Sequence, residues 1–92
     1  MDELQFMNPK PIGVSVQKLD GNVVELECPK ITTDMVKSTQ DAAKHADKDA
    51  GGALCEQMAI FFGGKKDDYK VFDARVIKRV IEWMSEQFKN PT

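Results

Sequence analysis

The residue types that most often perform chemistry are scarce in this sequence and widely separated. His45 is the only histidine, and Cys28 and Cys55 are the only cysteines. A general base needs a nucleophile or an orienting carboxylate, and a zinc site needs further histidine or cysteine ligands at workable spacing. The thiols lack CxxC spacing and the Cys–His signature of a nucleophile, which favours free thiols in a reducing cytoplasm over a disulfide. We interpret His45 as a surface residue and expect no enzymatic activity.

One short motif has the opening spacing of a calcium loop. Asp47-x-Asp49-x-x-Gly52 places two carboxylates and a glycine at the first, third and sixth positions. However, Gly51 stands at the fifth position, where an oxygen ligand is needed, and Met58 stands at the twelfth, where a bidentate Glu is required. Two ligands cannot replace a hydration shell, so we interpret the motif as a solvated helix end and expect no metal.

A second motif, Gly63-Gly64-Lys65-Lys66, contains residues found in phosphate-binding loops. A P-loop needs the longer frame G-x-x-x-x-G-K-[ST] after a strand. Here the glycines follow a predicted helix, whose C-terminal carbonyls repel anions. The motif therefore indicates helix termination, and we expect no cofactor.

Arg75, Lys78 and Arg79 form a basic cluster in the last predicted helix. Glu82 lies four residues after Lys78 and three after Arg79, as on a solvated helix face. A DNA-recognition helix would carry further basic residues after a tight turn, and the chain has a net charge of −2. A solvated face is favoured over partner docking, and DNA binding comes third.

Length and composition indicate one domain with an N-terminal extension. The 92 residues are 41% hydrophobic and 30% charged, which is typical of a small globular domain. Pro9 and Pro11 block regular structure, so residues 1–12 are predicted to be a flexible arm, from which Phe6 or Met7 could dock on the domain at 13–92. The acidic N-terminus is no signal peptide, and no apolar run reaches the roughly 18 residues of a membrane span. We expect a cytoplasmic protein.

From Gly13 the apolar residues alternate with polar ones. Val14 and Val16 in one run, and Val24 and Leu26 in the next, flank a turn that contains Gly21. Two alternating runs joined by a glycine-containing turn predict a β-hairpin over about 13–28 with one buried face. An isolated hairpin is marginal in water, so this one must pack on helices.

The first helix is predicted over about 32–48, with a Thr hydroxyl as its cap and Ile31 as a hydrophobic staple. Two adjacent glycines weaken a helix, so residues 50–53 are expected to separate it from a second helix over 53–62, although they could be a frayed joint in one bent helix. Gly63-Gly64 ends the second helix. The inner positions of the first helix are mostly small: Met35, Val36, Thr39, Ala42, Ala43 and Ala46.

The third helix is predicted over about 73–88, with Asp73 as its cap. Before it, Tyr69, Val71 and Phe72 are expected to turn back toward the core. The fold class is therefore mainly helical α+β, an N-terminal hairpin packed on three helices.

The last helix carries more apolar width than an ordinary surface helix, whose apolar face spans about 100°. The hairpin could cover all of it, or part could remain as a patch that binds another chain or a second copy. The candidate partner-binding residues are Phe61, Phe62, Val76, Val80, Trp83, Met84 and Phe88.

Several motifs between Leu19 and Phe88 give the chain a family resemblance. They are the turn Asp20-Gly21-Asn22 ahead of a strand, the helix entry Pro-x-Ile-Thr-Thr-Asp-Met at 29–35, Met58-Ala-Ile-Phe-Phe-Gly-Gly ahead of a short loop, and Val71-Phe-Asp-Ala-Arg-Val-Ile at the start of an amphipathic helix. In these features the chain resembles the short tail assembly chaperones of long-tailed (siphovirus-like) bacteriophages and prophages.

The resemblance implies a non-enzymatic role in virion assembly. Chaperones of this family coat the tape measure protein in many copies, keep it soluble and recruit tail tube subunits, and in many relatives a ribosomal frameshift adds a tube-binding extension. The implied partners are thus the tape measure protein and the tail tube protein, with a homo-oligomer possible and no nucleic acid or membrane. The alternative is a small helical regulatory or DNA-binding protein.

Overall fold

The computed structural model describes residues 4–89 and begins, after the arm, with the predicted hairpin. Strands β1 (Ile12–Gln17) and β2 (Val23–Cys28) pair antiparallel. At the turn, the Gly21 N–H donates to the Lys18 carbonyl at 2.9 Å and the Lys18 N–H donates to the Asn22 carbonyl at 2.8 Å. Gly21 has a φ of 92°, a value that favours glycine and fits a type I turn followed by a bulge. The hairpin prediction is confirmed.

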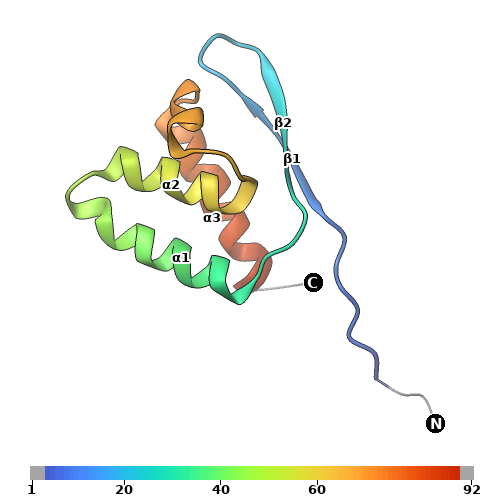
Figure 1. Cartoon of the computed structure of the whole chain (residues 1–92). Helices are drawn as coiled ribbons and strands as arrows, with labels where there is room; N and C mark the ends of the chain where they lie inside the picture. Colours follow the sequence, from blue (N-terminus) through green and yellow to red (C-terminus); the bar gives the residue numbers. More distant parts are fainter. Residues whose placement is uncertain (1–3, 90–92) are drawn as a thin grey trace.

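The rest of the described chain is helical (Figure 1). Thr32 caps the first helix, because its hydroxyl accepts the Met35 N–H at 3.1 Å. Gly63 ends the second helix at a φ of 87°, and Asp73 precedes the third. The α-helices are α1 (Thr33–Ala43), α2 (Ala50–Phe62) and α3 (Ala74–Lys89), and the short 3-10 helices are η1 (Lys44–Asp47) and η2 (Lys66–Val71).

The break between the first two helices lies earlier than predicted. The expected break at residues 50–53 is wrong, since α2 already begins at Ala50, while α1 tightens into η1 after Ala43. The Asp49 carboxylate accepts the Gly52 N–H at 2.9 Å and so caps α2. A Cβ on Gly52 would lie 2.2 Å from that carboxylate, so the glycine makes room for the cap. The two glycines therefore start a helix instead of interrupting one.

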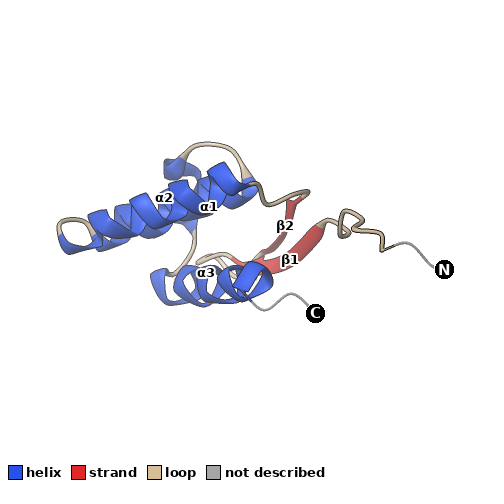
Figure 2. Cartoon of the chain, turned by 90° about the horizontal axis from the view of Figure 1, so that it is seen from below, coloured by secondary structure: helices blue, strands red, loops and turns tan. Residues whose placement is uncertain are grey.

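Helix α2 is the centre of the fold. It contacts α1, η1, η2, α3 and β2. Figure 1 shows α1 and α2 side by side, and in Figure 2, where these two helices overlap, α3 and the hairpin lie on the same side of them. Between α1 and α2 the buried Gln57 side chain donates to the Thr39 carbonyl at 3.4 Å, and Ala42 is also buried. The small residues on α1 thus let it pack closely against α2.

The core has two parts, which share the half-buried Phe62, Val80 and Ile81 at their border. The larger part joins the hairpin, α2, η2 and α3 through Val16, Cys55, Met58, Tyr69, Phe72 and Ile77. The smaller part joins the end of β2 to α2 and α3 through Cys28, Phe61 and Met84. Both parts depend on the hairpin lying against the helices, as the fold prediction required.

Several side chains predicted to be inside are exposed. Ala43 and Ala46 are exposed. Ala46 lies in η1, where the chain has left its α-helical path, so helical spacing no longer places it on the inner face. Val71 is 45% exposed, and its carbonyl instead accepts the Leu19 N–H at 2.8 Å, tying the hairpin turn to the chain before α3. Phe6 and Met7 do not dock on the domain. In the described part of the chain, no helix is long and apolar enough to cross a membrane.

Candidate functional site

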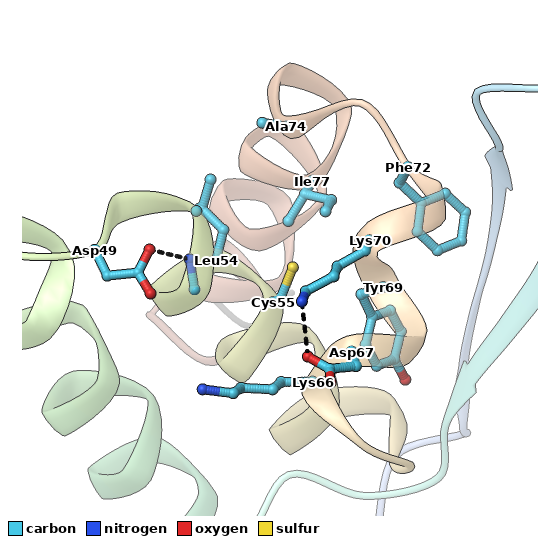
Figure 3. A pocket seen from close by; sticks show the side chains of 12 residues that line it. Asp49, Leu54, Cys55, Lys66, Asp67, Tyr69, Lys70, Phe72, Ala74 and Ile77 are labelled. Atoms are coloured by element: carbon cyan, nitrogen blue, oxygen red, sulfur yellow. Dashed lines mark hydrogen bonds and ion pairs between the residues drawn. The ribbon is translucent and has the colours of Figure 1, made fainter.

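One hollow among the described residues has a volume of about 370 Å³ and lies between α2, η2 and the start of α3 (Figure 3). Three of its four charged side chains are already engaged. The Lys70 ammonium lies 3.2 Å from the Asp67 carboxylate, and Asp49 caps α2. The lining residues are Asp49, Gly51, Gly52, Leu54, Cys55, Lys66, Asp67, Tyr69, Lys70, Phe72, Ala74 and Ile77.

The thiol of Cys55 and the phenol of Tyr69, which line this hollow, are held in their neutral forms. Burial raises the pKa of the Cys55 thiol, so the thiolate that would act as a nucleophile is disfavoured. Burial likewise raises the pKa of Tyr69, whose hydroxyl donates a hydrogen bond to the Gly63 carbonyl. His45 lies elsewhere, with its Nδ1 3.6 Å from a Glu56 carboxylate oxygen. Residues 4–89 contain no group of three or more His, Cys, Asp or Glu that could hold a metal ion.

The second hollow, here called the groove, has a volume of about 280 Å³ and lies between β1 and α3. Its lining residues are Val14, Ser15, Val76, Arg79, Val80 and Trp83. The apolar lining residues on α3 are Val76, Val80 and Trp83. Their spacing of four and then three residues places them on one face of the helix. Trp83 is 45% exposed, so a large aromatic surface remains open to solvent at the groove.

Arg79 supplies a positive charge to this apolar groove. No hydrogen bond or ion pair holds its guanidinium within the described chain, and neither it nor Lys78 pairs with Glu82 as the sequence suggested. Arg75, one turn earlier, is bound to Asp73 at 2.7 Å. The groove therefore offers apolar contact beside a guanidinium that is free to bind an anion.

The predicted partner-binding residues divide between the core and this surface. Phe61 and Met84 are 2% and 0% exposed and form the smaller part of the core. Phe62 and Phe88 are half-buried beside them, and the Phe61 ring lies 6.3 Å from Phe62 and 6.4 Å from Phe88, between centroids. The structure brings Val76, Val80 and Trp83 together in the groove.

Three groove residues were not among the predicted site residues: Val14, Ser15 and Arg79. The predicted hairpin pointed to Val14 and Ser15 as possible site residues, since a two-stranded sheet leaves an unpaired edge on each strand. The signal for Arg79 was its position three residues after Val76 and four before Trp83, which places it on the same face of α3.

Comparison with known proteins finds no family model, no curated protein and no solved structure that matches this chain.

Proposed function

We propose that this protein is a tail assembly chaperone of a long-tailed phage or prophage. In this proposal it binds an apolar segment of the tape measure protein, keeps that protein soluble and helps to recruit tail tube subunits. The observation that carries the proposal is the groove, where Trp83 is 45% exposed beside two half-buried valines of α3. Exposed aromatic side chains in apolar hollows are the common anchors of protein–protein interfaces.

The chemistry of the chain supports a binding role. In the larger hollow, burial keeps Cys55 and Tyr69 in their neutral forms, and the groove is lined by side chains that bind without reacting. A coat of many replaceable copies requires contacts that release, and a small apolar groove provides modest affinity.

Co-expression with the tape measure protein tests the proposal. The wild-type chain should keep the tape measure protein in the soluble fraction and co-purify with it. Trp83→Ala should weaken that complex by about tenfold or more, which corresponds to a modest interface hot spot. Leu19→Ala is the matched control, because Leu19 is 67% exposed at the hairpin turn, away from the groove. An insoluble tape measure protein with no complex would refute the proposal.

A further inference from the structure

The segment that precedes β1 carries large apolar side chains that contact almost nothing. Leu4 is 86% exposed, Phe6 is 92% exposed and Met7 is 80% exposed. Residues 4–11, here called the arm, extend away from the helices (Figure 1). Clusters of exposed apolar side chains in soluble proteins often mark sites of interaction.

The arm is poorly suited to fold back onto its own domain. Pro9 and Pro11 have a fixed φ, and the residues that precede them, Asn8 and Lys10, are restricted to extended conformations. Residues 8–11 therefore favour an extended connection over the reverse turn that would return Phe6 to the groove beside Val14. The geometry favours a receptor on another molecule.

The groove lies against a strand edge that can accept an extended segment. In the antiparallel ladder, the bond from the Lys18 N–H to the Asn22 carbonyl places Val16 and Val14 in hydrogen-bonded pairs with β2. The alternate residues Gly13, Ser15 and Gln17 then direct their backbone N–H and C=O groups away from β2. Among the described residues, no hydrogen bond beyond the ladder uses these groups. An added strand would bond to them.

Charge selects the direction in which the arm would lie. Helix α3 runs opposite to β1, because Leu19 bonds to Val71 just before α3, whereas Ile12 and Phe88 pack on the same part of the core. Asp2 and Glu3 precede Leu4 in the sequence. If the arm ran antiparallel to β1, these carboxylates would lie toward the basic start of α3.

The opposite direction would be unfavourable. A parallel arm would bring Asp2 and Glu3 toward Glu82 in the second half of α3, where like charges repel. The antiparallel direction instead sets Phe6 and its neighbours on Val80 and Trp83, with the acidic residues toward Arg79.

The apolar arm matches the apolar groove, β1 has an unpaired edge, and the acidic end of the arm complements the basic start of α3. From these three features we infer that the groove receives the arm of a second copy of this chain, antiparallel to β1. Each copy carries both an arm and a groove, and antiparallel pairing is compatible with a two-fold axis, so reciprocal exchange closes a dimer. The inference goes beyond the proposed function and does not depend on it, because it concerns what covers the groove when no other protein is bound.

The dimer should be weak and easily reversed. Two short arms form an interface near the lower limit of specific interfaces, about 1,200 Å² in total, for which micromolar dissociation constants are ordinary. Association should therefore be measured on the full chain over a range from about 1 μM to about 500 μM. Sedimentation equilibrium gives the mass directly.

Substitution in the arm is the first test. Phe6→Ser should weaken dimerisation by at least tenfold without affecting folding, because Phe6 is 92% exposed. Gln5→Ser is the matched control, since it shortens the neighbouring polar side chain, and it should leave the dissociation constant within about twofold. A wild-type chain that stays monomeric over the whole range would overturn the inference, and so would a dimer that Phe6→Ser leaves intact.

Charge exchange is the second test and examines the direction of the arm. Arg79→Glu and Glu3→Lys should each weaken the dimer severalfold, and the double variant should recover most of the loss. Lys37→Glu, on the exposed face of α1, is the control and should have little effect. Two single losses that add without recovery would refute the antiparallel placement. A monomer whose Trp83 emission responds to Phe6→Ser would show instead that the arm binds its own groove.

Discussion

Helices α2 and α3 both carry many apolar residues, but they use them differently. Helix α2 is contacted by four other helices and by β2 and buries Ala53, Cys55, Gln57, Met58 and Phe61. The described part of α3 buries Ile77 and Met84, while Val76, Val80 and Trp83 line the groove. Apolar content alone therefore does not separate a structural helix from a binding helix. What separates them is how many other elements surround the helix.

The largest effect should come from truncating the centre of α2. Met58 is 0% exposed and lies in the larger part of the core. Met58→Ala removes buried methylenes and leaves a cavity, so it should lower the free energy of unfolding by about 2–5 kcal/mol, as measured by urea denaturation. Met7→Ala is the matched control because Met7 is 80% exposed, and its effect in the monomer should stay within about 0.5 kcal/mol. If both variants lost the same free energy of unfolding, the burial of Met58 would not explain its contribution to stability.

A smaller effect should come from the residue that ends α2. Gly63 has φ 87° and ψ −179°, a backbone region that residues other than glycine rarely adopt, while a Cβ there would meet no atom within 4 Å. Gly63→Ala should therefore cost about 1–3 kcal/mol of stability through backbone strain alone.

Gly13→Ala is the control for that substitution. Gly13 lies in β1 and does not have a positive φ, and a Cβ added to it would meet no atom within 4 Å. Its replacement should leave the free energy of unfolding nearly unchanged or slightly raised. A Gly63→Ala protein as stable as the wild type in thermal melts would contradict the role of Gly63 as the residue that allows α2 to end there.

Replacing Trp83 should affect binding more than stability, whereas replacing Met58 should mainly affect stability. Because Trp83 is 45% exposed, Trp83→Ala should cost less stability than Met58→Ala, about 1–2 kcal/mol, while it weakens every complex made through the groove. The fluorescence of Trp83 provides a second measurement. Its emission should be solvent-like in dilute monomer and should shift to the blue when the groove is filled. A fully buried spectrum in the monomer would eliminate the groove as an open surface.

Much of the fold follows from local patterns. The alternation of Val14 and Val16 predicted the hairpin, and Thr32, Gly63 and Asp73 marked helix ends correctly because each acts through its own backbone neighbourhood. The predicted start of α2 was wrong, because the Asp49 cap outweighs the low helix propensity of Gly51 and Gly52. The Asp49 side chain fits there only because residue 52 has no Cβ.

The candidate site was harder to predict than the fold. Helical spacing placed Val76, Val80 and Trp83 on one face of α3, but it also included Phe61 and Met84, which the core occupies. Whether an apolar side chain is covered depends on tertiary contacts between distant segments. The groove is lined both by Val14 and Ser15 of the hairpin and by Trp83 of α3, more than 50 residues later in the sequence, and no local pattern encodes that arrangement.

The smallest effect concerns how α3 begins, and it depends on pH. The Asp73 carboxylate accepts the Arg75 N–H at 2.8 Å, and Nη2 of the Arg75 side chain lies 2.7 Å from its second oxygen. The hydrogen bonds from the Arg75 side chain, followed by the bond from its backbone, lower the pKa of Asp73 from 3.8 to about 2. Because the folded-state pKa is below the unfolded value, this group stabilises the fold fully above pH 3.8 and loses that contribution as the pH falls through about 2.

Asp73→Asn should therefore separate the cap from its charge. The amide oxygen can still accept the Arg75 N–H, so α3 should still begin at the same residue. The wild-type protein should be more stable than the variant above pH 4, and the difference should shrink as the pH falls toward 2. Arg75→Ala removes the largest cause of the pKa shift but keeps the backbone bond, so it should lose part of the same pH dependence. If the stability difference between wild type and Asp73→Asn is the same at pH 2 and pH 6, the charge of Asp73 does not stabilise α3, and the start of this helix depends on the capping hydrogen bond and on packing.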